Sequence, residues 1–406
     1  MLAPFSILSI GLAIAIGYFR RVNIGLVSIA FAFAIGHFLA DVPPGQIING
    51  WPMSLFFMLL GITLLFGIAR ANGSLGLIAR RIVGATRGRT RLIPPVFFVM
   101  SGVLAALGAG NIAVCALVLP IAMTVAVDYR ISPLLMATLT IAGANAGGLS
   151  PVAPTGIIAL TLARESHVDI GLRVFYRQII GQCLLATTVY FLFRGHRLRN
   201  QPPAAPGPAE PFTPAHWATI AVFLIVVAGI VFGGWNIGLT AFTGAVILLF
   251  LRVADEQQAI QSVPWSTLIL VSGVGMLVRV CEGVGGIDLL AHWLTKLMNA
   301  QTAAPILAVI GGVLSIVSSA SGVVMPTLIP TVPGLVAEIG GDATRMISAI
   351  IIGAHVVTNS PISTLGALAV ASAGAEIDKA TLFKNLFLFA LAGLIYAALL
   401  VYIGVV

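Results

Sequence analysis

Uncharged oxygen-bearing side chains gather where long apolar stretches of this chain are interrupted. In the first half they are Asn111, Asn145, Ser150 and Thr155. The set in the second half is larger and consists of Ser318, Ser319, Ser321, Thr358, Asn359, Ser360, Ser363 and Thr364. Amide and hydroxyl oxygens coordinate hard monovalent cations such as Na⁺, and their hydrogens bind oxyanions. These residues are therefore candidates for binding a cation and an anion.

Two of the interruptions are copies of each other. Residues 141–163 align without a gap on residues 351–373, and the identical pairs are Ile141/Ile351, Gly143/Gly353, Ala144/Ala354, Ser150/Ser360, Pro151/Pro361, Gly156/Gly366, Ala159/Ala369 and Ala163/Ala373. Roughly 2 or 3 identities would arise by chance in so apolar a composition. Both copies contain a Ser-Pro step followed by a glycine. A pair of broken hydrophobic segments in corresponding positions is typical of the binding site of a secondary transporter.

A broken helix can bind ligands without a charged side chain. Free N–H groups and the positive end of a helix dipole lie on one side of the break and free carbonyls on the other, so one break can hold an anion and a cation. Residues 92–127, 131–163 and 297–337 contain no Asp, Glu, Lys or Arg. A proton pump built on a buried carboxylate is therefore not expected, because intramembrane acids mark such relays.

The composition predicts a polytopic membrane protein. Of the 406 residues, 59% are hydrophobic and only 8% are charged, and the mean hydropathy is +1.08. No soluble core needs so much apolar surface, so most of the chain belongs in a lipid bilayer. The net charge of +8 comes from arginines in short loops, which indicates membrane orientation and no nucleic-acid role. The three cysteines stand singly in apolar stretches and indicate neither a disulfide nor a metal site.

Apolar spans follow the same order in both halves. They lie near residues 2–18, 22–40, 52–69, 132–163 and 174–193, and again near 216–232, 236–251, 264–281, 346–373 and 382–404. Each half also has one longer stretch, 92–127 or 303–337, with small residues at its middle, at 108–111 or 318–321. These stretches predict re-entrant hairpins, whose tips must be surrounded by protein or by a polar cavity. Residues 2–18 are expected to be a retained first helix.

Five crossings and one hairpin in each half predict two inverted repeats, residues 1–195 and 216–406. An odd number of crossings makes the second unit enter the membrane with the opposite orientation. Residues 196–215 are rich in Pro and Ala and are expected to be a cytoplasmic linker. The fold class predicted is therefore an all-α integral membrane protein with two inverted repeats, each containing a hairpin and a broken helix.

The basic residues give an orientation. If both termini lie outside, the inner loops hold most of the arginines, including Arg21 and Arg70, and the outer loop at 41–51 has no basic residue. In a bacterium this places the protein in the inner membrane with both termini in the periplasm. Residues 74–84, which include Arg80 and Arg81 among apolar residues, have the pattern of a short interfacial helix.

His355 takes the place of Asn145 in the second copy. A lone histidine in an apolar segment is more often a packing residue, but its position also makes it a candidate for substrate binding or proton coupling. Ser, Thr and Gly are likewise common in membrane helices because they permit close packing. The prediction of a site therefore depends on their clustering at four symmetric breaks.

The run GNIAVCALVLPIA followed by NAGGLSPVAPTG resembles the bacterial malonate/dicarboxylate carriers of the ion transporter superfamily, which includes the divalent anion/sodium symporters. The symporters carry Ser-Asn-Thr at their hairpin tips, nine residues before a proline. Asn111 stands nine residues before Pro120 and matches that asparagine, whereas Gly110 and Ile112 replace its neighbours. The Ser150-Pro151 and Ser360-Pro361 steps match the Thr-Pro steps of the symporters. The replaced side chains remove oxygens that hold sodium and carboxylate in that family.

The resemblance implies a homodimer in which a scaffold holds two mobile transport domains that move like elevators. It implies import of a small dicarboxylate, malonate or a C4-dicarboxylate, coupled to Na⁺ or H⁺, with no covalent cofactor. The substrate residues implied are Asn111, Ser150, Pro151, Thr155, Ser321, His355, Ser360, Pro361, Ser363 and Thr364. The cation residues implied are Gly108, Asn111, Asn145 and Gly148 at one site and Ser318, Ser319, Thr358 and Asn359 at another.

Other functions remain open at this point. The chain would also fit the membrane subunit of a multi-component carrier that depends on a binding protein, or a transporter of another organic or inorganic anion. An intramembrane enzyme is not expected, because the sequence has no HExxH, no GxSxG and no paired carboxylates within its spans.

Overall fold

The computed structural model describes residues 2–84, 89–200 and 211–405. Within these ranges the chain consists of helices joined by short loops, without a β-strand. Six helical stretches in the described residues are long and apolar enough to cross a membrane: Met53–Ala71, Thr90–Asp128, Trp265–Gly283, Ala320–Ile339, Ala343–Ala371 and Lys379–Tyr402. The prediction of an all-helical, multi-pass membrane protein is confirmed.

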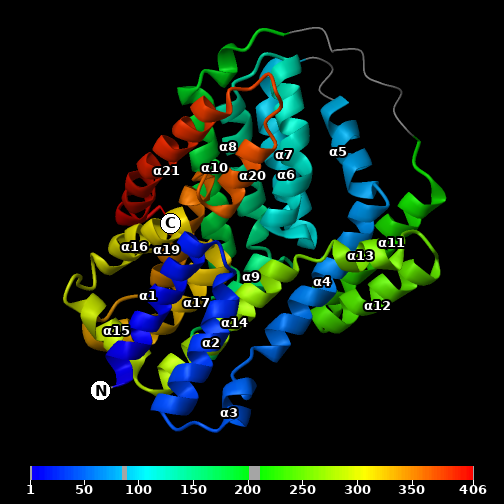
Figure 1. Ribbon diagram of the computed structural model, residues 1–406. Helices are drawn as coiled ribbons and strands as arrows, with labels where there is room; N and C mark the ends of the chain where they lie inside the picture. Colours follow the sequence, from blue (N-terminus) through cyan, green and yellow to red (C-terminus); the bar gives the residue numbers. More distant parts are fainter. Residues whose placement is uncertain (1, 85–88, 201–210, 406) are drawn as a thin grey trace.

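The first half contributes ten α-helices to the described residues. They are α1 (Leu2–Arg20), α2 (Ile24–Phe33, extended by a π-helical turn to Leu39), α3 (Pro44–Asn49), α4 (Met53–Ala71), α5 (Ser74–Gly84), α6 (Ile93–Leu104), α7 (Gly110–Asp128), α8 (Pro133–Gly148), α9 (Pro154–Glu165) and α10 (Arg173–Leu192). Figure 1 shows α6 and α7 running side by side. Helix α5 occupies the segment for which an interfacial helix was predicted, whereas the short helix α3 was not predicted.

The second half repeats this order. Its helices are α11 (Pro214–Gly233), α12 (Ile237–Phe250), α13 (Glu256–Gln261), α14 (Trp265–Gly283), α15 (Gly286–Thr295), α16 (Ala303–Val317), α17 (Met325–Leu328), α18 (Val332–Ile339), α19 (Ala343–Val356), α20 (Thr364–Ala371) and α21 (Lys379–Tyr402). The segment α17–α18 takes the place of α7, because prolines at 326, 330 and 333 divide it into short helical pieces. Helices α13 and α15 were not predicted from the sequence.

Matching residues begin matching helices in the two halves. Asn23 precedes α2, and its side-chain oxygen accepts a hydrogen bond from the Gly25 amide at 2.8 Å. Asn236 precedes α12, and its side-chain oxygen accepts from the Leu239 amide at 3.0 Å. An asparagine at this position satisfies an amide that the helix leaves without a partner. The repeated Asn-Ile-Gly-Leu motif is therefore a helix start in each half.

The two broken segments lie at the centre of the molecule. All residues of α8 from Leu134 to Gly148 are buried, and α19 is buried from Met346 to Val356. Helix α8 packs against α6, α7 and α10, and α19 packs against α16 and α21. Because α8 and α19 are shielded from lipid, unpaired backbone groups at their ends can be tolerated.

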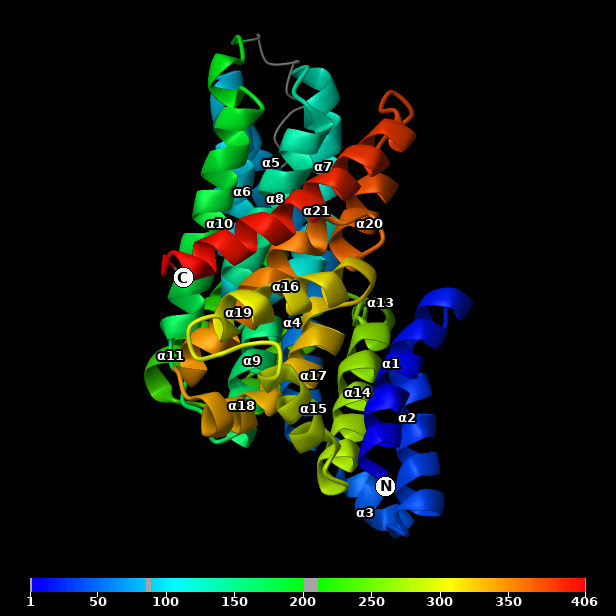
Figure 2. The same cartoon turned by 90° about the vertical axis from the view of Figure 1, so that its left-hand side faces the viewer.

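Other long helices of one half pack against helices of the other half. Helix α4 of the first half packs on α12 of the second, and α14 of the second half packs on α2 of the first. Figure 2 shows α1, α2 and α14 side by side along one edge of the molecule. Figure 1 shows α4, α11 and α12 grouped together at another edge of the molecule. The tips of the two hairpins lie between these outer groups and the buried broken segments.

Candidate functional site

The tip of the first hairpin rests on the break between α8 and α9. Gly108 and Gly110 form the turn, with φ of 118° and 74°, a region that disfavours side chains with a Cβ. A Cβ added to Gly108 would lie 3.2 Å from the Val152 carbonyl oxygen, and one added to Gly110 would lie 3.0 Å from the Pro154 ring. The two glycines therefore allow the tip to pack directly on the break.

The tip of the second hairpin rests on the break between α19 and α20 in the corresponding way. The Ser360 hydroxyl donates to the Ile316 carbonyl and the Ser363 hydroxyl donates to the Ser318 carbonyl, both at 3.1 Å. Ser319 holds the turn, because its hydroxyl accepts a hydrogen bond from the Gly322 amide at 3.1 Å. The Ser-Pro step at 360–361 thus fastens a hairpin to a broken helix.

A chain of buried hydrogen bonds joins the two broken segments. Asn111 donates from Nδ2 to Asn145 Oδ1 at 2.9 Å, and Asn145 donates from Nδ2 to Thr358 Oγ1 at 2.8 Å and to the His355 carbonyl at 3.1 Å. The Thr358 hydroxyl donates to the same carbonyl at 2.8 Å. The side chains in this chain are nearly inaccessible, with Asn145 at 0% exposure. Residues predicted for the two separate cation sites therefore lie in one network.

A cavity of about 120 Å³, called here the first cavity, lies between the first hairpin, α4 and α14. On its hairpin side are Asn111 and Thr155, together with Ser321 from the tip of the second hairpin. On its other side are Thr63, Arg70 and Thr267. The predicted residues Asn111, Thr155 and Ser321 are thus brought together from three helical segments. Arg70 is the single charged residue among the described residues that line this cavity.

Two helices begin at the first cavity. The first turn of α7, at Gly110 and Asn111, and the first turn of α9, at Pro154 and Thr155, both line it. Neither helix has a side-chain hydrogen bond from its N-cap, which is Ala109 or Ala153, although the Ile112 amide donates to Asn111 Oδ1 at 3.0 Å and Pro154 has no amide hydrogen. The first amides of an α-helix have no partner within the helix and carry the positive end of its dipole. The cavity therefore combines two favourable positions for an anion.

A second, more open cavity of about 660 Å³ lies at the tip of the second hairpin. The predicted residues Ser318, Ser319, Pro361, Ser363 and Thr364 line it, together with Arg21, Asn23 and Ser266. Arg21 is the one charged residue among its described lining residues. Each cavity thus presents hydroxyl groups and one arginine and has no described carboxylate in its lining.

Several predicted residues line neither cavity. Ser150 is 6% exposed, and Pro151 follows it in the turn after α8. Gly148 packs against Asn111, and a Cβ added to it would lie 3.3 Å from that of Asn111. Asn359 donates to the Val356 carbonyl at 3.2 Å, and its Oδ1 atom is buried without a partner among the described residues.

His355 also lies away from both cavities. It is 0% exposed, and its Nδ1 atom lies 2.7 Å from the Ile351 carbonyl one turn earlier in α19. Because a carbonyl only accepts hydrogen bonds, Nδ1 must carry the proton in this contact. The Nε2 atom has no partner among the described residues. This geometry is that of a neutral packing histidine.

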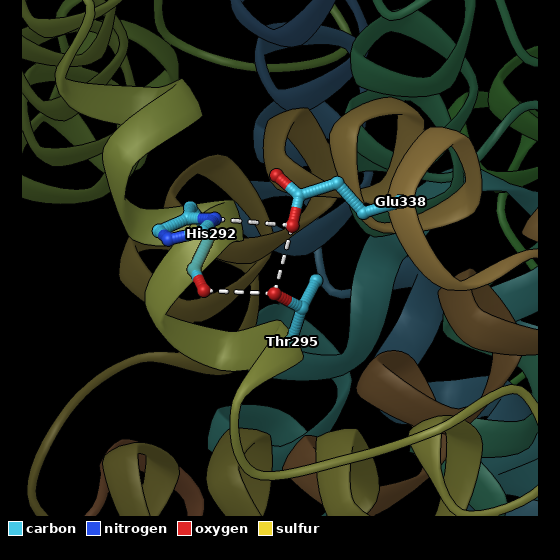
Figure 3. A network of polar contacts seen from close by, with 3 residues as sticks. All are labelled: His292, Thr295 and Glu338. Atoms are coloured by element: carbon cyan, nitrogen blue, oxygen red, sulfur yellow. Dashed lines mark hydrogen bonds and ion pairs between the residues drawn. The ribbon is translucent and has the colours of Figure 1, made fainter.

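Two surface ion-pair groups lie away from the cavities. Arg279 on α14 contacts Glu165 at the end of α9 at 3.0 Å and Glu282 at 3.3 Å. Glu338 at the end of α18 contacts His292 on α15 at 3.2 Å and Thr295 at 2.8 Å (Figure 3). Both groups are largely exposed, so each is expected to contribute little to stability.

Sequence reasoning missed Arg70 and Arg21 as cavity residues and treated them only as markers of the inner face. Arg70 lies in the last turn of an apolar helix, and Arg21 follows the last residue of α1. An arginine at the end of a span usually extends to the membrane interface, and the sequence does not reveal that a cavity opens there. Thr63 lies seven residues before Arg70 and therefore on the same face of α4, a spacing that could have indicated a shared cavity.

No group of three or more His, Cys, Asp or Glu side chains that would hold a metal ion occurs among the described residues. A cation would instead depend on neutral oxygens, and the unpartnered Oδ1 atom of Asn359 is one that fits such a role.

Comparison with known proteins finds one matching family model and similar solved structures. The model of the family described as "Dicarboxylate carrier protein MatC N-terminus" matches residues 2–148. No curated protein matches the chain. The YdaH transporter of Alcanivorax borkumensis has a similar structure, with a TM-score of 0.63, 15% sequence identity, and 94% of this chain and 96% of that chain covered.

Neisseria gonorrhoeae MtrF, described as illuminating a class of antimetabolite efflux pumps, is also similar in structure. The TM-score is 0.58 at 15% identity, with 92% of this chain and 84% of that chain covered. At this identity the likeness shows a shared fold. The matched family and both structural neighbours are transport proteins and not enzymes. Residues 2–148 therefore match the model of the dicarboxylate carrier family, and the whole chain is a multi-pass membrane protein whose fold is similar to that of the two solved transport proteins.

Proposed function

We propose that this chain is a secondary active transporter that imports a small dicarboxylate, malonate or a C4-dicarboxylate, together with Na⁺ or H⁺. The observation that carries this proposal is the first cavity. The N-termini of α7 and α9, the Ser321 hydroxyl and the cation of Arg70 meet there without a described carboxylate, and the Thr155 hydroxyl lies beside them, donating to Asn111 Oδ1 at 3.3 Å. Such a lining favours an anion over a cation or a neutral solute.

The coupling ion would bind close to the substrate. Near the second break, the neutral oxygens are those of Ser318, Ser319, Thr358 and Asn359; Ser319 and Thr358 already accept hydrogen bonds, whereas Asn359 Oδ1 is buried without a partner among the described residues. At the first break the side-chain oxygens of Asn111 and Asn145 already accept hydrogen bonds. Backbone carbonyls near Gly108 and Gly148 would therefore be the ligands there. Neutral oxygens suit Na⁺ better than a proton.

The two halves are proposed to be inverted repeats. The reciprocal packing of α2 on α14 and of α4 on α12 supports this arrangement. Gly143 and Gly353 support it too, because a Cβ on either would lie 2.0 Å from a carbonyl oxygen, that of Phe98 or of Ala308. These carbonyls occupy corresponding positions in the two halves, so the same close helix crossing occurs twice.

Transport is proposed to follow an elevator movement. The hairpins with α8, α9, α19 and α20 would form the moving domain, and α1, α2, α4, α11, α12 and α14 the scaffold. The protein would be a homodimer in the bacterial inner membrane with both termini in the periplasm. The first cavity lies between moving and fixed helices, which is where a substrate would be bound and released.

Uptake of labelled malonate into proteoliposomes tests this proposal. An inward Na⁺ gradient is expected to drive accumulation, succinate to compete, and Ser321→Ala to weaken uptake, because Ser321 lines the cavity with a hydroxyl that has no other described partner. Ser132→Ala is the matched control, since this exposed serine precedes α8 and makes no capping hydrogen bond. A pH gradient that drives uptake without Na⁺ would identify H⁺ as the coupling ion.

Absence of transport of both malonate and succinate by well-folded protein under either gradient would contradict the proposal. Export would then be the next function to test, because MtrF is described as illuminating a class of efflux pumps. Copurification of a small membrane partner would instead indicate a subunit of a multi-component carrier.

A further inference from the structure

Arg70 is an unpaired cation at the wall of the first cavity. It lies in the last turn of α4, and its side chain forms no hydrogen bond or ion pair with another described residue. Arg279 on α14 provides a contrast, because Glu165 and Glu282 neutralise it at 3.0 and 3.3 Å. The positive charge of Arg70 thus remains available to a ligand, whereas that of Arg279 is already engaged.

Two further polar groups in this cavity are also without partners. The Ser321 hydroxyl, 5% exposed, makes no hydrogen bond to a described residue, and neither does the Thr267 hydroxyl on α14. Buried polar groups in proteins are normally hydrogen-bonded, so the unpartnered hydroxyl of buried Ser321 indicates a ligand or water in the cavity, and the half-buried Thr267 offers a second hydroxyl there. Ser321 belongs to the hairpin side of the cavity, and Thr267 and Arg70 to the side formed by α4 and α14.

The lining of the cavity therefore contains two groups of potential anion-binding residues, which come from different helices. One group consists of the first turns of α7 and α9 with Ser321, and the other consists of Arg70 on α4 with Thr267 on α14. A monocarboxylate can contact one group, whereas a dicarboxylate can contact both. An arginine fork binds a carboxylate through two parallel hydrogen bonds, which are stronger than bonds between neutral groups.

We infer that Arg70 binds the second carboxylate of the substrate and so selects dicarboxylates over monocarboxylates. This inference rests on the proposed function, because it assigns a role within the same site. One carboxylate lies at the N-termini of α7 and α9, and the other reaches across the cavity to the guanidinium group. Arg70 belongs to α4, so this contact links the substrate to a helix outside the hairpins.

Binding to the purified full-length protein tests the inference separately from transport. Titration calorimetry compares malonate with monomethyl malonate, which has a similar shape and one negative charge fewer. The wild-type protein is expected to prefer malonate by about tenfold or more, a factor that corresponds to about 1.4 kcal/mol. Arg70→Gln is expected to remove this preference by weakening malonate binding alone, and Arg70→Lys to retain part of it, because Lys keeps the charge without the fork.

Arg20→Gln is the matched control. Arg20 is an exposed arginine in the last turn of α1 and lines neither cavity, so its loss should leave the preference unchanged. An unchanged preference in folded Arg70→Gln protein would overturn the inference while the proposed function stands. A folded wild-type protein that binds neither compound would overturn the proposed function, and the inference with it.

Discussion

The Nδ2 atom of Asn145 lies 2.8 Å from the hydroxyl oxygen of Thr358, although 213 positions separate the two residues in the chain. Asn145 belongs to the broken segment of the first half and Thr358 to that of the second. Asn145 also accepts a hydrogen bond from Asn111, so one amide connects the first hairpin tip to both breaks. A change in one break can therefore be transmitted to the other through a single buried side chain.

Asn145→Ala is expected to destabilise the protein and abolish coupled uptake. It removes the partner of the Asn111 amide and leaves buried polar groups unsatisfied, which costs about 1–3 kcal/mol for each group. Thermal unfolding in detergent and uptake into proteoliposomes provide the two measurements. Thr358→Val is expected to have a smaller effect on unfolding in the same direction.

Thr138→Val is the control for Thr358→Val. Thr138 is equally buried in α8, but its hydroxyl donates only to carbonyls of its own helix, at Leu134 and Leu135. If Thr358→Val and Thr138→Val retained uptake to the same extent, the hydrogen bond between Asn145 and Thr358 would have no role in transport.

A second prediction concerns the effect of the ion pair between Glu165 and Arg279 on the conformational populations. In the proposed mechanism α9 moves and α14 is fixed, so this contact must break during transport. The side chains are 37% and 45% exposed, and such pairs contribute about 0–1 kcal/mol. Glu165→Gln is therefore expected to shift the conformational populations by no more than about fivefold, with little change in thermal stability.

The labelling rate of Ser166→Cys by a thiol reagent measures this shift, because Ser166 lines the same surface pocket as Glu165 and Arg279. Cys183 must be replaced first, since it is the one native cysteine that is not buried. Glu282→Gln is the control, because Glu282 and Arg279 share one helix and move together. Equal labelling rates in the Glu165→Gln and Glu282→Gln variants would show that the ion pair between Glu165 and Arg279 does not stabilise one conformation.

The sequence predicted the helical fold and the positions of the breaks because both depend on local patterns. Repeated Ser-Pro steps and small-residue clusters mark the points where a helix cannot continue, and Asn111, Thr155 and Ser321 lie at a shared cavity as a result. The partners of Asn145 and the place of Arg70 depend instead on which helix faces meet. In a membrane protein this information is weak, since lipid and protein interior are equally apolar and hydrophobic periodicity does not mark the buried face.

Substitution of Gly143 or of Gly353 by alanine is expected to disturb the same helix crossing in each half. A Cβ on either would lie 2.0 Å from a backbone carbonyl oxygen, which cannot move aside as a flexible side chain could. Gly143→Ala and Gly353→Ala should each lower the free energy of unfolding by about 1–3 kcal/mol or more. Gly11→Ala in α1, where nothing lies within 4 Å, should change it by less than about 1 kcal/mol.

Thermal unfolding of the three glycine variants in one detergent makes the comparison. Loss of stability in only one of the two paired variants would count against equivalent packing in the two halves. A destabilised Gly11→Ala protein would show that the method does not separate close helix crossings from helix positions in general.

The environment of His355 predicts that this residue does not couple transport to protons. Its imidazole is fully buried, donates from Nδ1 to the Ile351 carbonyl, and has no ion pair with a carboxylate among the described residues. Protonation would place an uncompensated charge in the protein interior, which is strongly unfavourable. His355→Gln keeps a hydrogen-bond donor of similar size and should leave the pH dependence of malonate uptake unchanged. A variant that folds normally but loses a component of uptake driven by a pH gradient would instead identify His355 as a proton-binding residue, and Na⁺ would no longer be the preferred coupling ion.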